Sequence, residues 1–350
     1  MVQSIEWEEN HLRIIDQTEL PVKTHFINLY TIEEVFEAIK KLRVRGAPAI
    51  GVTAAYGLYL GVLNQSFSSE SDFFSFLDIK INYLTSSRPT AVNLQWSLQR
   101  IKKELSKSSD HDFNAMKKQL LEIAIEIHEE DKVRCKRIAD NGQDIIKENY
   151  NVLTHCNTGA LATGGIGTAL GIIFQSFELG KNIKVFATET RPLLQGARLT
   201  VWELNESKIP ATLICDSTVA WLMNQKKIDL VIVGADRIAA DGSTANKIGT
   251  FNLAILANYY KIPFYIAAPL STVDVSVTRG DQIPIEFRDS EEVRNVFNKY
   301  PITIAEIDCW NPAFDITPPE LISGIVTDQE IILPPFESNI KKAILKQTIN

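Results

Sequence analysis

Five short apolar runs in the second part of the chain place the strongest constraint on its fold. Segments with helical character separate these runs, and such alternation is typical of a parallel β-sheet with helices on both faces. Sheets of this kind bind ligands at the carboxyl ends of their strands. The predicted strands are residues 152–154, 183–187, 211–215, 230–233 and 264–267. At their carboxyl ends we expect Cys156, Glu189, Asp216, Asp236 and Pro269.

The residues before this alternation have a helical pattern instead. At 350 residues the chain is longer than one hydrophobic core usually serves, so we expect two domains. Apolar residues alternate with polar ones around a polar turn over 5–14, which predicts a small β-hairpin. Thr31 and Glu34 form a capping-box pattern ahead of an amphipathic helix. Further helices are predicted over 49–63, up to about 85, over 93–105 and over 114–146.

These patterns give an α/β protein with a mainly helical N-terminal domain over residues 1–145. The hairpin belongs to that domain, and a mostly parallel sheet occupies the C-terminal domain over residues 146–350. The composition is that of an ordinary globular protein, with 45% apolar and 23% charged residues.

Charge and cysteine usage limit the possible partners. The chain has 43 acidic and 36 basic side chains and no long run of Lys or Arg, so binding to nucleic acid is not expected. Its four cysteines form no C-x-x-C pair, which argues against a zinc site or a disulfide framework and favours a reducing compartment. The N-terminus has no signal-peptide pattern and no window reaches the roughly 20 apolar residues of a membrane span, so we expect a cytoplasmic protein.

The turn after the first predicted strand is rich in glycine. Gly159, Gly164, Gly165 and Gly167 lie there, and we expect a helix to start within this stretch, so that bare amides could bind a phosphate. A dinucleotide fingerprint would need a third glycine where Leu170 stands, and no P-loop sequence is present. Close packing of a helix on a strand explains the glycines equally well.

Two reactive side chains follow predicted strands. Cys156 lies between a strand end and the expected helix start, where the helix dipole favours a thiolate; burial as a small apolar residue is an equally common fate. Asp236 follows the wholly apolar strand 230–233, where partial desolvation suits a carboxyl group to proton transfer. The alternative is that Asp236 caps the next turn or pairs with Arg237.

Cations and an amide complete the set of candidates. Asn246 and Lys247 are predicted at a helix start that faces the same edge of the sheet. Arg45 and Arg88 lie in bends of the helical part, and the planar fork of arginine suits phosphate oxygens. For either arginine, solvation or a structural ion pair is the alternative.

Taken together, these stretches resemble the family of 5-methylthioribose-1-phosphate isomerase, which also contains regulatory subunits of the eukaryotic translation-initiation exchange factor. The resemblance runs in the same order from about residue 5 to residue 327. The matching strings are VRGAPAIG (44–51), SRPTAVNL (87–94), CNTG (156–159), ETRP (189–192), GADRI (234–238), NKIGT (246–250) and NPAFDITP (311–318).

The resemblance implies an aldose–ketose isomerase of methionine salvage that acts on a small phosphorylated sugar. It implies a helical N-terminal domain, a Rossmann-like C-terminal domain, a homodimer, and no metal or cofactor. Cys156 and Asp236 match the catalytic pair of the family. The residues that match its substrate-binding set are Arg45, Gly46, Ala47, Arg88, Gln195, Asn246 and Lys247.

The chemistry gives an acid and a thiol a reason to share a site. Phosphate on the anomeric oxygen prevents opening to a free aldehyde, so an acid must assist ring opening before hydrogen moves from C2 to C1. We expect Asp236 to handle the proton and Cys156 to act at the C1/C2 face, while Arg45, Arg88, Lys247 and the glycine-turn amides fix the phosphate. The alternatives are an isomerase of 5-deoxyribose 1-phosphate or ribose 1,5-bisphosphate, or a non-catalytic regulatory subunit.

Overall fold

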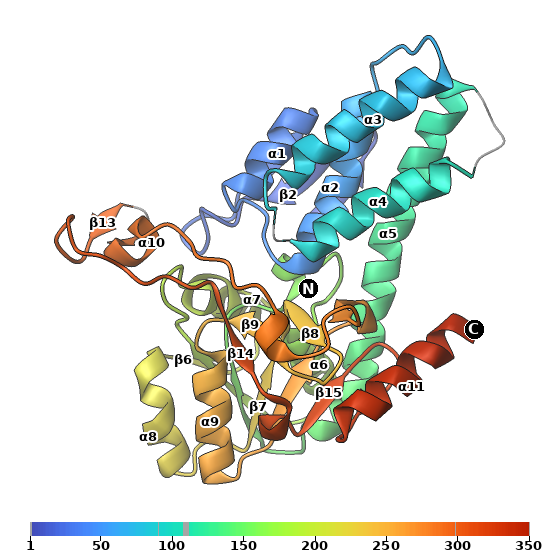
Figure 1. Cartoon of the computed structure of the whole chain (residues 1–350). Helices are drawn as coiled ribbons and strands as arrows, with labels where there is room; N and C mark the ends of the chain where they lie inside the picture. The colour runs from blue at the N-terminus through green and yellow to red at the C-terminus, as the bar shows by residue number, and fades with distance from the viewer. Residues whose placement is uncertain (1, 90, 108–111, 298, 350) are drawn as a thin grey trace. The chain divides into compact units, whose positions relative to one another are not determined.

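The computed structural model describes residues 2–89, 91–107, 112–297 and 299–349 (Figure 1). The chain divides into two compact units, which we call the helical unit and the sheet unit. The helical unit contains residues 2–134 and 160–167, and the sheet unit contains residues 135–159 and those from 168 onward. The meeting of two domains at residues 145 and 146 stays a prediction. Thr90 of the SRPT stretch and residues 108–111 of a predicted loop lie outside the described residues.

The helical unit begins with a small antiparallel sheet, of which the predicted hairpin β1–β2 forms two strands. A third strand, β3, pairs with β2 and was missed, because its four residues carry too little pattern to distinguish from a loop. The capping box is confirmed, since Thr31 Oγ1 accepts from the Glu34 N–H and the Glu34 carboxylate accepts from the Thr31 N–H. The elements are β1 Ile5–Glu8, β2 His11–Ile15, β3 Phe26–Leu29, α1 Ile32–Lys40, α2 Ala47–Val62, α3 Glu70–Thr85, α4 Val92–Leu105 and α5 Phe113–Gly142.

The sheet unit is built on seven strands in the order β16-β15-β10-β7-β4-β5-β6. All neighbours pair in parallel except β15 and β16, which are antiparallel. The six parallel strands have the order of a Rossmann sheet, whose direction of winding reverses between its first and fourth strands, here β4 and β7. The strands are β4 Asn151–Thr154, β5 Lys184–Thr188, β6 Ala211–Ile214, β7 Leu230–Val233, β10 Phe264–Ala267, β15 Gly324–Val326 and β16 Ile331–Ile332.

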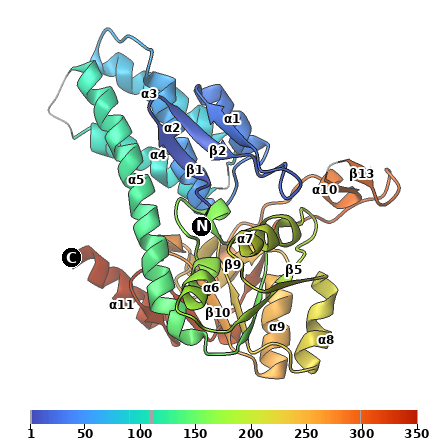
Figure 2. The ribbon, with the colours of Figure 1, turned by 180° about the vertical axis from the view of Figure 1, so that it is seen from behind.

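The five predicted strands are therefore confirmed, and the short pair β15 and β16 was missed. Successive side chains of a strand point to opposite faces, so both faces of this apolar sheet need cover. Leu230 and Ile232 of β7 join the core that contains α6, whereas Val231 and Val233 join the core that contains α8 and α9. The last two helices lie side by side in both views (Figures 1 and 2). The helices are α6 Ala169–Glu178, α7 Val201–Glu206, α8 Val219–Asn224, α9 Thr250–Tyr260 and α11 Phe336–Ile349.

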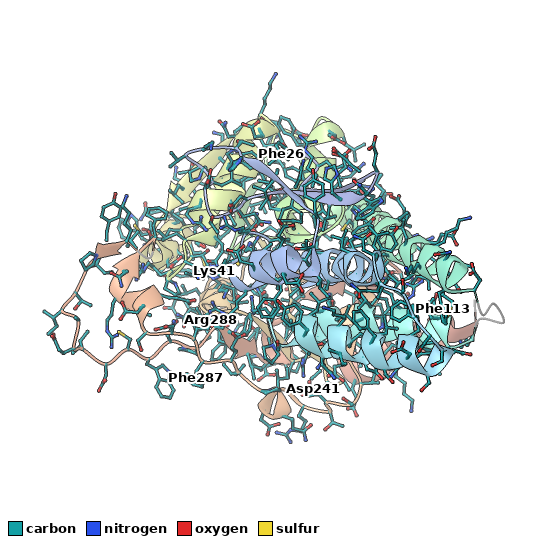
Figure 3. All side chains as sticks on the ribbon, turned by 90° about the horizontal axis from the view of Figure 1, so that it is seen from above. Phe26, Lys41, Phe113, Asp241, Phe287 and Arg288 are labelled. Atoms are coloured by element: carbon teal, nitrogen blue, oxygen red, sulfur yellow. The ribbon has the colours of Figure 1, made fainter. Side chains whose placement is uncertain are left out.

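A second, small sheet follows the carboxyl end of β7 and has the order β11-β8-β9-β14. Its strands are β8 Arg237–Ala239, β9 Thr244–Lys247, β11 Val273–Asp274 and β14 Phe314–Thr317. Between β11 and β14 the chain makes an extension that contains the short helix α10 (Glu291–Arg294). Phe287 and Arg288, labelled in Figure 3, lie near its start, where Arg288 forms an ion pair with Glu292.

Candidate functional site

Cys156 and Asp236 follow the two strands at which the winding of the sheet reverses. Cys156 comes two residues after the end of β4, and Asp236 comes three residues after the end of β7. The two strands are direct neighbours and run in parallel, so both residues lie at the carboxyl edge of the sheet. Rossmann sheets bind their ligands in the crevice at this point, because the connections of the adjacent strands leave in opposite directions there.

The backbone of Cys156 is held in an uncommon conformation. Its φ is 62°, in the left-handed region that side chains other than glycine and asparagine rarely adopt, and the residue is only 7% exposed. The hydroxyl of Thr190 accepts from the Cys156 N–H at 2.9 Å, and the hydroxyl of Thr200 donates to the Cys156 carbonyl at 2.5 Å. A strained backbone conformation persists only where neighbouring groups hold it in place, as these two hydroxyls do. Such residues are common at functional sites.

Glu203 supports the same turn and was not predicted. Its carboxylate accepts from the Asn157 amide at 2.7 Å, and both side chains are buried. A Cβ added at Gly159 would lie 2.3 Å from the Glu203 carboxylate, so this glycine allows the close approach. The only signal in the sequence was an acid between Trp202 and Leu204 on an otherwise apolar segment, and it did not indicate a partner 46 residues away.

The helix start expected within the glycine-rich stretch 152–171 is confirmed, and it lies near the end of that stretch rather than next to the cysteine turn. Residues 160–167 belong to the helical unit, and α6 begins only at Ala169. Within that stretch the Gly164 N–H donates to the Asp131 carboxylate at 2.6 Å, and the Gly165 N–H donates to Thr163 Oγ1 at 3.2 Å. These two amides are thus engaged inside the protein rather than arranged as a phosphate cradle.

The segment that contains Asn246 and Lys247 is a strand, not the predicted helix start. The two residues end β9, and α9 begins at Thr250 after Gly249, whose φ is 103°. Helical and extended patterns are hard to separate in four residues, and pairing with β8 and β14 decided the outcome. The strand places Lys247 Nζ 4.9 Å from the centroid of the Phe314 ring.

Asp236 and Asn246 lie next to each other in the backbone register. The Asp236 N–H donates to the Ala245 carbonyl at 2.9 Å, at the point where β8 begins to pair with β9. Arg237, the alternative partner of Asp236, has its guanidinium 3.5 Å from the Asp274 carboxylate. The carboxyl group of Asp236 and the amide of Asn246 are thus brought to one edge by a tertiary pairing.

Asp315 is a further acid at this edge, on β14 opposite Asn246. Its carboxylate accepts the N–H of Gly249 at 2.8 Å and that of Phe251 at 3.1 Å, so it caps the start of α9 from another strand. Burial raises the pKa of Asp315 to about 6, and the two backbone hydrogen bonds only partly oppose this effect. Asp315 lies inside the matched string 311–318, but no spacing rule assigned it a role.

The side chain of Gln195, in the loop after β5, has an unusual environment. It is 5% exposed, and its Oε1 has no hydrogen-bond partner among the described residues. The loop itself is tightly held, because Asp216 accepts from the N–H groups of Thr190 and Arg191 at 2.8 Å. A buried acceptor without a partner is costly, which is typical of a position that a ligand completes.

The remaining predicted residues belong to the helical unit. Arg45 Nε donates to Gln17 Oε1 at 3.2 Å, directly before α2. Gly46 has a φ of 96°, and Ala47 is the first residue of α2. Arg88 lies in the bend between α3 and α4, as predicted. The structure thus gathers Cys156, Gln195, Asp236, Asn246 and Lys247 in the sheet unit and Arg45, Gly46, Ala47 and Arg88 in the helical unit.

Neither a cluster of metal ligands nor a membrane-spanning helix occurs among the described residues. No group of three His, Cys, Asp or Glu side chains that could hold a metal ion occurs in the described part of the chain. Nor is any helix in that part long and apolar enough to cross a bilayer.

Known proteins match the chain over nearly its whole length. A sequence model described as the initiation factor 2 subunit family matches residues 43–334. The chain belongs to this family. The family resemblance inferred from the motifs is thereby confirmed.

Two relatives are similar throughout. The methylthioribose-1-phosphate isomerase of Desulforamulus reducens is 47% identical over 97% of this chain and 98% of its own length. The 5-deoxyribose 1-phosphate isomerase of Moorella thermoacetica is also 47% identical, over 98% of this chain and 97% of its own.

Two solved structures confirm the predicted fold class. The 5-methylthioribose 1-phosphate isomerase of Pyrococcus horikoshii has a TM-score of 0.92 at 39% identity and covers all of this chain, with 97% of its own chain matched. The eIF-2B subunit delta of A. fulgidus has a TM-score of 0.87 at 40% identity, over 99% of this chain and 100% of its own.

Proposed function

We propose that this protein is an aldose–ketose isomerase that converts 5-methylthioribose 1-phosphate to 5-methylthioribulose 1-phosphate in methionine salvage. The observation that carries the proposal is the placement of Cys156 and Asp236 after the two strands that flank the switch point. Relatives named for this reaction support the proposal. One of them is 47% identical to this chain over 97% of its length.

In the proposed reaction Asp236 moves the proton and Cys156 works at the reacting carbons. The sugar carries its phosphate on the anomeric oxygen, so the ring must be opened with help from an acid at the ring oxygen. Hydrogen then moves from C2 to C1, and the C2 hydroxyl becomes the ketone. The strained and doubly hydrogen-bonded backbone of Cys156 would hold its side chain still while the sugar reacts.

The proposal also assigns roles to the candidate substrate-binding residues. Arg45, Arg88 and Lys247 supply cations for the phosphate, and Asn246 supplies a polar side chain beside Asp236. Gln195 offers a sugar hydroxyl its buried side-chain oxygen, for which the described part of the chain supplies no partner. Gly46 and Ala47, at the start of α2, complete the proposed substrate-binding set.

The decisive experiment compares turnover of the 5-methylthio, 5-deoxy and 5-phospho forms of ribose 1-phosphate by the purified protein. We expect the 5-methylthio sugar to have the highest kcat/KM. Preference for the 5-deoxy sugar would favour the activity named for the Moorella relative. A folded protein inert toward all three would instead favour the regulatory-subunit function.

The residue assignment has its own test. Cys156→Ser and Asp236→Asn should each lower kcat by at least about a hundredfold, the usual contribution of a positioned proton-transfer group. Full activity in either variant would reject that residue alone. With substrate deuterated at C2 in ordinary water, label kept at C1 indicates direct transfer, and lost label indicates an exchangeable base.

We also propose that the protein acts in the cytoplasm as a homodimer. The scattered cysteines, none of them in a disulfide among the described residues, support a reducing compartment. Exposed aromatic side chains of the sheet unit, such as Trp221 and Tyr259, offer apolar surface to a second copy. Light scattering at several protein concentrations measures the assembly directly, and a monomeric mass at all of them would reject the dimer.

A further inference from the structure

His155 connects two parts of the sheet unit that lie 93 residues apart in the sequence. The side chain is 3% exposed, its Nε2 lies 2.9 Å from the Ile248 carbonyl oxygen, and its Nδ1 lies 2.6 Å from Thr188 Oγ1. A carbonyl oxygen only accepts, so Nε2 carries the hydrogen and Nδ1 accepts from the Thr188 hydroxyl. Burial lowers the pKa of His155, which agrees with a neutral ring held in a single tautomer.

One end of this imidazole leads to Cys156. Thr188 Oγ1 lies 3.1 Å from Thr190 Oγ1, and the same Thr190 oxygen accepts the Cys156 N–H at 2.9 Å. Both threonines are fully buried. Because the Thr188 hydroxyl donates to the ring, the Thr190 hydroxyl donates to the Thr188 hydroxyl. Every donor in this series of hydrogen bonds then has an acceptor. A continuous path of hydrogen bonds therefore joins the ring to the strained backbone of Cys156.

The other end of the imidazole leads to the turn between β9 and α9. Ile248, whose carbonyl accepts from His155, directly follows Asn246 and Lys247. The turn is closed on itself, because Thr250 Oγ1 accepts from the Asn246 amide at 2.9 Å and donates to the Lys247 carbonyl at 2.7 Å. A displacement of Ile248 therefore displaces both residues before it.

We propose that His155 is a positioning residue that sets the spacing between Cys156 and the pair Asn246 and Lys247. The inference rests on the proposed function, in which Cys156 acts on the sugar and the pair binds it. Simple filling of the core would need only an apolar side chain of similar size. Two directed hydrogen bonds to different segments fix a distance and an orientation as well, and buried polar networks that are fully satisfied have this effect.

Two substitutions separate the ends of the ring. In His155→Gln the side-chain amide can reach the position of Nε2 and keep a bond to Ile248. In His155→Asn the shorter amide can reach only the position of Nδ1, so it keeps Thr188 and loses Ile248. Thr154→Val, one residue earlier on β4, is the matched control, because its buried hydroxyl has no partner among the described residues.

The expected result is a difference between the two variants in substrate binding. With 5-methylthioribose 1-phosphate, His155→Asn should raise KM about tenfold or more, the usual effect of losing one buried hydrogen bond at a binding site. His155→Gln and Thr154→Val should keep KM within about threefold of the wild type. Equal KM values for the Asn and Gln variants, with melting temperatures lowered equally, would overturn the proposal in favour of a purely structural role.

A second readout does not depend on turnover. Iodoacetamide alkylation of each cysteine, followed by peptide mass spectrometry, reports how firmly the Cys156 turn is held. We expect Cys156 to react several-fold faster in His155→Gln, which loses the bond to Thr188, than in the wild type and at the wild-type rate in His155→Asn, while Cys135 stays protected in all. If the wild type turns over no sugar phosphate, the proposed function fails, and these alkylation rates still decide the role of His155. Identical rates in all variants would reject it.

Discussion

The backbone of Gly46 lies directly against Ala162, so that a Cβ added at Gly46 would come within 2.5 Å of the Ala162 Cα. Gly46 also has a φ of 96°, where side chains are strained. The contact joins the start of α2 to the 160–167 stretch, and both belong to the helical unit. Gly46, which was predicted to bind substrate, is thus also required for packing within the helical unit.

Gly46→Ala should lower the free energy of unfolding by more than about 2 kcal/mol, because backbone strain and a steric clash add together. Gly180→Ala is the control, since Gly180 has a φ of 85° but nothing within 4 Å of its added Cβ. The control should lose only about 1 kcal/mol from strain alone. Equal losses in urea denaturation would show that the Ala162 contact contributes nothing.

Gln195→Leu should impair binding without destabilising the protein. The substitution removes a buried acceptor that has no partner among the described residues, so the melting temperature should stay constant or rise. In the proposed enzyme KM for 5-methylthioribose 1-phosphate should rise about tenfold, because a sugar hydroxyl loses its acceptor. Thr317→Val, which removes another buried oxygen with no partner among the described residues, is the control. An unchanged KM in Gln195→Leu would contradict a ligand at this position.

Asp315 should make the protein less stable as the pH rises through the mildly acidic range. Its pKa in the folded state is about 6, above the ordinary value of 3.8, so the folded protein holds this proton more tightly than the unfolded chain. Its contribution is complete below about pH 4 and is lost as the pH rises to about 6. Urea unfolding at pH 4 to 7 measures it. The stability of the wild type relative to Asp315→Asn should fall over this range, and a rise would contradict the shift.

His128 should make the protein less stable as the pH falls, which is the opposite of the effect of Asp315. It lies in α5, with Nδ1 3.1 Å from the Tyr56 hydroxyl and Nε2 3.1 Å from the Gly164 carbonyl oxygen. Burial lowers the pKa of His128 to about 4 from 6.5, so the unfolded chain binds this proton first. Stability should therefore fall as the pH drops from 6.5 toward 4, by on the order of 3 kcal/mol.

His128→Gln tests that expectation, because its amide can still reach Gly164 but does not titrate. Denaturation at pH 7.5 and pH 5 should show a smaller loss of stability in the variant than in the wild type. Tyr56→Phe is the control, because it removes one hydrogen bond to His128 at both pH values. Equal acid sensitivity in the wild type and His128→Gln would assign the effect to other groups.

Local sequence patterns determined a large part of this fold. The apolar runs predicted five strands, the Thr31 and Glu34 pair predicted a helix start, and the strand ends predicted Cys156 and Asp236 at one edge of the sheet. These features depend on side-chain periodicity and on hydrogen bonds between residues a few positions apart. Such information is present in any short window of the chain.

The tertiary structure alone decided which segments meet. The strand order placed β4 beside β7, and pairing with β14 turned Asn246 and Lys247 from an expected helix start into a strand end. The partners of His155 and of Gly164 lie far away in the sequence. A four-residue segment has nearly equal energies as helix or strand, and a buried polar group has many possible partners. Packing and hydrogen-bond satisfaction across the whole unit select one of them, and no local window contains that choice.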